Sequence, residues 1–261
     1  MGMFNVLLTL GVVGGFLSGL LGLGGAIIMI PLMLTVPKIL GVGALSMKAV
    51  AGLSMIQVVF ASLSGVARHR KNKFVSMKLI YTLGIAMAIG SGFGSIISKY
   101  MSNQVLMIAF GFIAVIAALM MFIPPRSEGS ESITNPDDIQ FNKPLAAVLG
   151  VIIGSLAGMV GAGGGFILIP VMIYVLKIPI RITIGTSLGV VLIGAVIGAI
   201  GKMVTGQVDW LLALALIISS VPSAQLGSLV SKKTPALILR YSLTLLIILT
   251  SVEIWYKIIV V

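Results

Sequence analysis

The chain alternates between long apolar segments and short polar or basic connections. The apolar segments cover residues 4–36, 42–67, 74–97 and 105–123 in the first half, and residues 145–176, 182–204, 210–230 and 236–260 in the second half. About 20 apolar residues in a helix span the hydrocarbon core of a bilayer. The pattern therefore predicts an all-α polytopic membrane protein with four apolar segments in each half.

The first apolar segment of each half carries the same interruption, a glycine cluster that is followed by a proline. The two copies are Gly15–Leu34 and Gly154–Ile173, and they align without a gap when Gly15 is placed on Gly154. In water such a cluster would form a turn. Inside a long apolar segment it predicts a helix that is broken within the membrane.

After the glycine clusters, the two halves continue to match in a slightly shifted alignment, which pairs Ser54 with Ser187. The duplication thus covers nearly the whole chain. It divides the sequence into a first membrane repeat at residues 1–123, a polar cytoplasmic linker at residues 124–143 and a second membrane repeat at residues 144–261.

The distribution of Lys and Arg favours repeats of opposite orientation. If both broken segments cross the membrane, the repeats are parallel and the 17 basic residues divide nine to eight between the two sides. If both are re-entrant, the repeats are inverted and the division is twelve to five, which fits the positive-inside rule. We therefore expect inverted repeats, with the basic loop Arg68–Lys78 and its counterpart Gly201–Asp209 on opposite sides. The arms of each broken segment are unequal, about 17 and 11 residues, so the second arm is expected to reach only mid-membrane.

Composition narrows the class of protein further. Hydrophobic residues make up 59% of the chain and charged residues 9%, against about 25% charged in soluble domains. The net charge of +11 lies in short loops, where it orients the helices, so we expect a lipid bilayer and no nucleic acid as partner.

The absence of cysteine excludes disulfides and thiolate metal sites, and we expect no cofactor. Many of the 32 glycines follow small-xxx-small spacing, which permits close helix packing in lipid.

The glycine clusters are the first candidate site. No Lys-Ser/Thr follows them, so a nucleotide-binding loop is not indicated. Helices that begin directly after the clusters would offer free N–H groups and the positive end of a helix dipole, and two such ends would form an anion site. The alternative is that the glycines only permit tight packing. The candidate anion-binding residues are Gly22, Gly24, Gly25, Ala26, Gly161, Gly163, Gly164, Gly165 and Phe166.

Hydroxyl groups early in the next segment of each half are the second candidate. Ser54, Thr186 and Ser187 are expected to donate hydrogen bonds to an anion, or alternatively to bond back to their own helix. Arg240, a few residues into the last segment, is a candidate for attracting anions, although its side chain can also extend to the interface. Gln57 is a further polar side chain inside an apolar segment. No acidic residue lies in the middle of a segment, and the sequence shows no serine–histidine pair, carboxylate pair or metal cluster, so an enzyme is not expected.

With these motifs the sequence resembles the sulfite exporter TauE/SafE family, bacterial and archaeal permeases for anions of sulfur and organosulfur compounds. The residues that carry the resemblance are Gly15–Gly25, Gly154–Gly164, the following Pro31 and Pro170, Gly185–Leu188 and Gly206–Trp210. The first half departs from the last two motifs, because Gly52-Leu53-Ser54 lacks the Thr and Phe74-Val75-Ser76 lacks the Asp-Trp.

The resemblance implies a multi-pass transporter of the plasma membrane that carries a small sulfur-containing anion and binds it at the repeat interface. A membrane potential of 100 mV, negative inside, contributes about 2.3 kcal/mol per charge, so an anion is driven outward without a coupling ion. The expected function is therefore secondary transport, and export in particular. An anion channel with the same dipole-lined site is the alternative.

Overall fold

The computed structural model describes residues 2–71, 75–122 and 136–260, and within them every regular element is helical. Eight helices in this part of the chain are long and apolar enough to cross a membrane: α1 (Met3–Leu21), α3 (Met47–Lys71), α4 (Met77–Ile97), α5 (Asn103–Met121), α6 (Lys143–Val160), α8 (Ile180–Val204), α9 (Trp210–Lys233) and α10 (Ala236–Val260). The shorter elements are α2 (Ala26–Ile39), α7 (Gly165–Pro170), a π-helical turn η3 (Val171–Val175) and the 3₁₀ turns η1 (Ser98–Tyr100) and η2 (Pro136–Asp138). The prediction of an all-α polytopic membrane protein is confirmed.

Side-chain caps fix where four of the long helices begin. Ser76, Ser102, Asn142 and Asp209 each accept a hydrogen bond from a backbone N–H three residues further on, at the starts of α4, α5, α6 and α9. Such caps satisfy one of the donors that a helix N-terminus leaves free. The polar connections therefore contain the residues that start these four helices.

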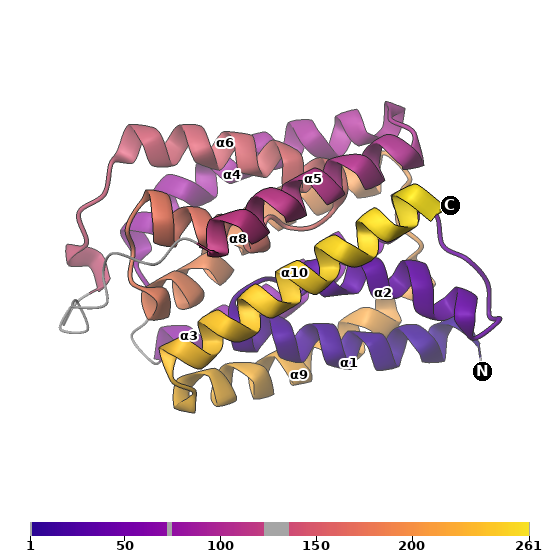
Figure 1. Cartoon of the computed structure of the whole chain (residues 1–261), viewed down its shortest axis with the longest axis horizontal. Coiled ribbons are helices and arrows are strands. Elements are labelled where there is room, and N and C mark those ends of the chain that lie inside the picture. Colours follow the sequence, from indigo (N-terminus) through magenta and orange to yellow (C-terminus); the bar gives the residue numbers. More distant parts are fainter. Residues whose placement is uncertain (1, 72–74, 123–135, 261) are drawn as a thin grey trace.

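The long helices run between two ends of one bundle, and both chain termini lie at the same end (Figure 1). We call the end at which α1 begins the first end. At this end, the start of α3 meets the end of α4 and the start of α5, because Lys48 bonds to the Lys99 carbonyl and to Asn103 Oδ1. At the opposite, second end, Tyr174 of η3 bonds to the carbonyl of Met121, the last residue of α5.

The returning arm of the first break is longer than the sequence indicates. After α2 the chain lies at the first end, where a Cβ placed on Gly43 would lie 3.3 Å from Cε of Met3 at the start of α1. The arm is longer than the 11 residues expected, because α2 contains both Pro31 and Pro37 and continues to Ile39. In the second half, Pro170 ends α7 and the chain continues as the turn η3.

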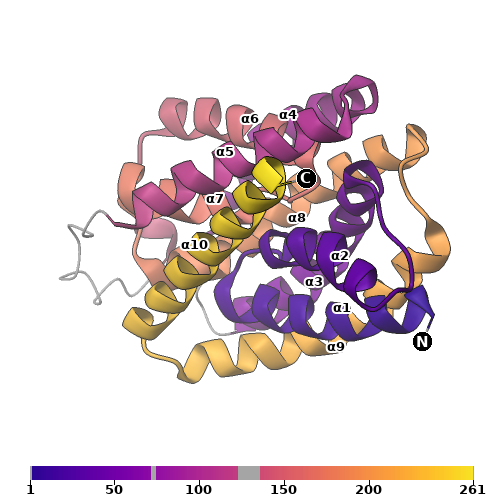
Figure 2. The same cartoon turned by 45° about the vertical axis from the view of Figure 1, so that its right-hand side comes forward.

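The two halves are interleaved rather than side by side. α1 of the first half packs against α9 of the second, and α6 of the second half packs against α4 of the first (Figures 1 and 2). Glycines bring these backbones together: a Cβ on Gly15 would lie 2.5 Å from the Ser220 carbonyl, and one on Gly154 would lie 2.8 Å from Cα of Met87. The small-xxx-small spacing thus serves helix packing, as expected.

α3 and α8 pack against each other between these outer pairs. Many of their residues are fully buried, whereas outward faces of α4, α5 and α9 carry exposed apolar side chains such as Phe93, Phe112 and Ile218. An apolar surface of this extent is typical of contact with lipid. The candidate site therefore belongs to the protein interior around α3 and α8.

Only the end of the linker lies within the described residues. There, Asp137 Oδ1 accepts hydrogen bonds from Ser76 Oγ at 2.9 Å and from the Lys78 backbone at 3.2 Å, and Ile139 is buried. This part of the linker is therefore attached to the start of α4. Residues 72–74 of the predicted basic loop and residues 123–135 lie outside the described residues.

Candidate functional site

The two glycine breaks meet at the centre of the molecule. A Cβ on Gly24 would lie 3.0 Å from Cγ1 of Val58 and 3.2 Å from Cγ1 of Val191, and a Cβ on Gly163 would lie 2.5 and 3.3 Å from the same two atoms. Val58 on α3 and Val191 on α8 are themselves matched positions of the two halves. A Cβ on Gly165 would also meet the Leu23 backbone. The structure thus brings the predicted glycine residues into one buried region.

Glycine is required at the breaks by the backbone conformation. In the two breaks, six glycines have φ between +62° and +83°, the left-handed region that costs little only for glycine. They are Gly22, Gly24 and Gly25 in the first break, and Gly161, Gly163 and Gly164 in the second. The three left-handed glycines in each break allow the following helix to reverse direction.

The reversals leave backbone donors without partners. Among the residues that the structure describes, no hydrogen-bond acceptor is found for the N–H groups of Ala26, Ile27 and Ile28 in the first turn of α2, or for those of Gly165 and Phe166 in α7. All five residues are buried. The expectation that the breaks present free N–H groups agrees with this geometry.

The matched serines bond across the two halves. Ser54 Oγ donates to the Gly161 carbonyl at 2.7 Å, and Ser187 Oγ donates to the Gly22 carbonyl at 2.8 Å. Each serine also approaches a carbonyl of its own helix, at 3.3 Å for Ser54 and 3.0 Å for Ser187. The serines lie at the breaks as predicted, but their protons are already donated to the protein, so in this conformation they tie each break to the opposite repeat.

Two other candidate residues have different surroundings. Thr186 Oγ1 accepts a hydrogen bond at 3.0 Å from the backbone N–H of Ser76, so it joins α8 to the start of α4. Arg240 is half-buried near the start of α10, at the second end of the bundle. Through this bond Thr186 joins α8 to the start of α4, and Arg240 lies at one end of the bundle.

Sequence reasoning left Gln57 and Ser18 out of the site. Both are fully buried, and in the described part of the chain neither the Gln57 amide nor the Ser18 hydroxyl has a hydrogen-bond partner. A Cβ on Gly14 would lie 2.5 Å from Gln57 Nε2 and 2.5 Å from Met29 Sδ, and a Cβ on Gly25 would lie 3.3 Å from Ser18 Cβ. Both polar groups thus lie beside the first turn of α2. The signal in the sequence was a glutamine inside an apolar segment.

The second half offers no such side chains at the matched positions. Gln57 corresponds to Val190 in the alignment that pairs Ser54 with Ser187, and Ser18 corresponds to Ala157 in the alignment of the glycine clusters. The backbone pattern of the breaks is therefore duplicated, but the additional polar groups belong to the first break alone.

Lys202 is not in a loop, as the sequence analysis placed it, but inside α8 with its side chain fully buried. Its Nζ donates to Ser98 Oγ at 2.6 Å, to the Met159 carbonyl at 3.1 Å and to Gln207 Oε1 at 3.1 Å. The helix ends at Val204, as the apolar segment 182–204 predicted, but the loop Gly201–Asp209 was taken to begin before that end and so included Lys202.

A second charged group lies between α10 and α2. Lys257 Nζ forms an ion pair with Glu253 Oε1 at 3.1 Å and bonds to the Pro31 carbonyl and to Thr35, whose hydroxyl in turn donates to Glu253. The network holds the second half of α2 against the last helix of the chain.

Comparison with known proteins agrees with this architecture. A family model described as "Sulfite exporter TauE/SafE" matches residues 7–254. The chain is 23% identical to the Bacillus subtilis (strain 168) protein "Probable membrane transporter protein YunE", with 97% of this chain and 98% of the relative covered. It is 27% identical to "Probable membrane transporter protein YdhB" of the same organism, with 92% and 94% covered. A "Probable membrane transporter protein" of Xylella fastidiosa (strain 9a5c) is 26% identical, with 89% and 87% covered.

No solved structure was found to match the chain. The relatives are named as transporters and not as enzymes, and they are aligned over most of their length. The family model covers nearly all of the eight apolar helices. The chain therefore belongs to the sulfite exporter TauE/SafE family and is a multi-pass membrane transporter.

Proposed function

We propose that the protein is a secondary transporter that exports sulfite, sulfonates or related sulfur-containing anions across the cell membrane. The anion binds where the two helix breaks meet, at the first turn of α2. The observation that carries this proposal is the group of buried donors without partners, namely the N–H groups of Ala26, Ile27 and Ile28 together with the Gln57 amide and the Ser18 hydroxyl.

A sulfur oxyanion matches these donors chemically. Its negative charge is spread over several oxygens, each of which accepts hydrogen bonds. A buried donor without an acceptor costs about 1–3 kcal/mol, so an anion that satisfies several of them is stabilised without any formal positive charge. α2 has 14 residues, and the positive end of its helix dipole lies at its N-terminus. The dipole therefore stabilises a bound anion further.

Export follows from the charge of the substrate. The potential of a bacterial or archaeal membrane is negative inside and drives an anion outward by about 2.3 kcal/mol per charge per 100 mV. Ser54 and Ser187 support a carrier mechanism, because their bonds to the opposite repeat can be exchanged when the breaks move relative to α3 and α8.

The proposal is tested with purified protein in liposomes that are loaded with radiolabelled sulfite. Gln57→Leu keeps the side-chain volume and removes both polar atoms, so we expect the KM for sulfite to rise by about tenfold, or about 1.4 kcal/mol. Ser91→Ala serves as the matched control, because Ser91 Oγ is also buried without a partner but lies on α4 beside Gly198. A wild-type KM in Gln57→Leu would place the anion elsewhere.

The same liposomes separate a carrier from a channel. A carrier shows saturable exchange of labelled against unlabelled sulfite, and its rate does not exceed that of a conformational cycle. Single-channel currents carried by sulfite would instead support the channel alternative.

A further inference from the structure

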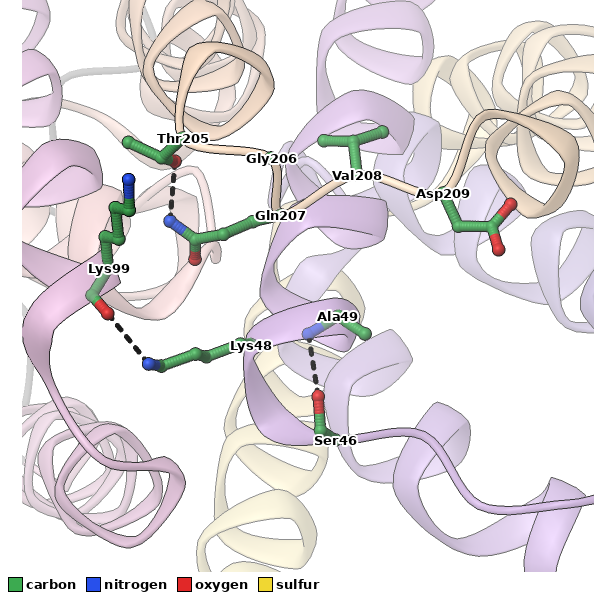
Figure 3. Close-up of a pocket in the computed structure, with 9 residues that line it drawn as sticks. All are labelled: Ser46, Lys48, Ala49, Lys99, Thr205, Gly206, Gln207, Val208 and Asp209. Carbon is green, nitrogen blue, oxygen red and sulfur yellow. Dashed lines mark hydrogen bonds between the residues drawn. The ribbon is translucent and has the colours of Figure 1, made fainter.

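An open cavity of about 560 Å³ lies at the first end of the bundle, where α3 begins and α8 passes into α9 (Figure 3). Its polar lining consists of Ser46, Lys48, Lys99, Thr205, Gln207 and Asp209. We propose that this cavity is a second anion site, at the mouth of the transport path, which receives small oxyanions with a sulfonate or sulfate-like head group between Lys48 and Lys99.

The two lysines lie close together because their helices meet at this end. Lys48 Nζ donates to the Lys99 backbone carbonyl at 2.8 Å, and the Lys99 side chain extends from there toward Thr205, so the two ammonium groups lie at separate places along one wall of the cavity (Figure 3). This bond uses one of the three N–H groups of Lys48. The remaining donors and those of Lys99 are available to an anion in the cavity.

The wall behind the lysines is held in a fixed arrangement. Gln207 Nε2 donates to Thr205 Oγ1 at 2.7 Å, and Gln207 Oε1 accepts from the buried Lys202 at 3.1 Å. Lys202 is bonded in turn to Ser98, which follows α4. The polar atoms of Gln207 are thus oriented by a buried network, as expected of a preformed site rather than a loosely packed surface.

The carboxylate of Asp209 does not neutralise the lysines. It lies at the opposite side of the cavity in Figure 3, where it accepts a hydrogen bond from the Leu212 backbone as the N-cap of α9. Within the described residues, neither Lys48 nor Lys99 forms an ion pair. The cavity therefore presents excess positive charge on one wall, which concentrates anions.

The duplication supports the same interpretation. Lys48 and Lys99 correspond to Arg181 and Lys232 in the alignment that pairs Ser54 with Ser187. Each half thus places one basic residue second in the long helix that follows its break, and another within two residues of the end of the next long helix. A transport path opens on both sides of the membrane. With inverted repeats, the matched basic pairs of the two halves would lie at opposite openings, one pair at each.

The cavity is tested through a single cysteine, since the chain contains none. Ser46→Cys places a thiol in the lining, and Gly2→Cys places one at the same end in open space as a control. Each variant is treated with the anionic sulfonatoethyl methanethiosulfonate and with its cationic trimethylammonium analogue. We expect the ratio of the anionic to the cationic rate to be about tenfold higher at the cavity position, and sulfate to slow the anionic reaction there in a saturable way.

Substitutions of the two lysines in the Ser46→Cys protein test whether they cause the preference for the anionic reagent. Lys48→Gln with Lys99→Gln should lower the ratio to that of Gly2→Cys and abolish protection by sulfate, whereas Lys48→Arg with Lys99→Arg should preserve both. Equal ratios at the two cysteine positions, or a ratio that the glutamine changes leave unaltered, would overturn the proposal.

The assignment of the cavity to the transported anion rests on the proposed function, but its affinity for anions does not. Gln57→Leu should impair sulfite transport and leave the reagent ratio at the cavity unchanged. The central site and the cavity are thus tested by separate measurements, and either can fail alone.

Discussion

At the scale of single residues, the two crossed serine bonds have the most direct consequence. Ser54 and Ser187 occupy matched positions and donate to the carbonyls of Gly161 and Gly22, each in the opposite repeat. Both serines are fully buried, where a hydrogen bond cannot be replaced by one to bulk water. The two bonds therefore hold the breaks in place from both sides.

Replacing either serine should destabilise the protein to a similar extent. We expect Ser54→Ala and Ser187→Ala each to lower the free energy of unfolding by about 1–3 kcal/mol, the cost of leaving a buried acceptor unpaired. Thermal unfolding in detergent measures this effect. Thr244→Ala is the control, because the Thr244 hydroxyl bonds to a carbonyl of its own helix. If all three variants unfold at the same temperature, the bonds between the repeats do not stabilise the protein more than a bond within one helix.

Several residue roles could not be predicted because they depend on which partner a side chain meets. The hydroxyls of Ser54, Thr186 and Ser187 were identified as polar groups in apolar helices, but the sequence could not show that Thr186 faces Ser76 while Ser187 faces Gly22. Gln57 was identified by the same reasoning. Its position beside α2 became visible only from the packing of α1 on α2 and α3.

The structure also changes how the glycine breaks can be tested. Gly24 and Gly163 have φ of +72° and +62°, so a valine at either position would be strained whether or not an anion binds there. Loss of transport in such variants would mix folding with binding. Side-chain changes at Gln57 avoid this difficulty.

At the scale of helices, glycine spacing was a reliable guide and proline was not. The small-xxx-small stripes predicted close packing, and α1–α9 and α4–α6 contain the closest backbone approaches. Pro31 closes the repeated motif in the sequence, yet it lies within α2. A proline removes one backbone hydrogen bond, and buried surroundings can stabilise the helix despite that loss.

The glycine stripe of α1 should tolerate no larger residue. A Cβ on Gly19 would overlap the backbone carbonyl of Ala224, which cannot move without separating α1 from α9, so we expect Gly19→Ala to cost about 1–3 kcal/mol. Gly92→Ala is the control, because its Cβ would lie 3.2 Å from a methyl group of Ile197, and alanine favours helix by up to about 1 kcal/mol. Chemical or thermal unfolding should rank the two variants in this order, and equal stability would contradict the packing argument.

At the scale of the whole molecule, the orientation of the two repeats is the main expectation that remains to be measured. In the structure, α1 begins at the first end, and the chain reaches α6 from the second end, where Asp137 bonds to the start of α4. The sequence predicted a division of basic residues of twelve to five between the two sides. Three of the five basic residues on the poorer side are Lys48, Lys99 and Lys202. In the structure, Lys48 and Lys99 line the cavity at the first end, and Lys202 is bonded to Gln207 in its wall.

Cysteine labelling of intact cells measures the orientation. Lys202 is buried and so unsuitable, but Tyr100 and Lys233 are matched positions of the two halves and both are exposed. With inverted repeats, an impermeant maleimide should label Tyr100→Cys from outside, and Lys233→Cys only after the membrane is permeabilised. Labelling of both variants in intact cells would instead require parallel repeats.

The pairing of α1 with α9 also sets the order in which the chain matures during synthesis. α1 is translated first, but its packing partner begins at Trp210, and at ~5–20 residues per second it emerges ~10–40 s later. Until then the glycine face of α1 that packs against α9 has no protein cover, and lipid or the insertion machinery must shield it. A chain that is truncated before α9 leaves this face uncovered permanently. The interleaved halves thereby give cellular proteolysis a structural means of distinguishing complete from incomplete copies.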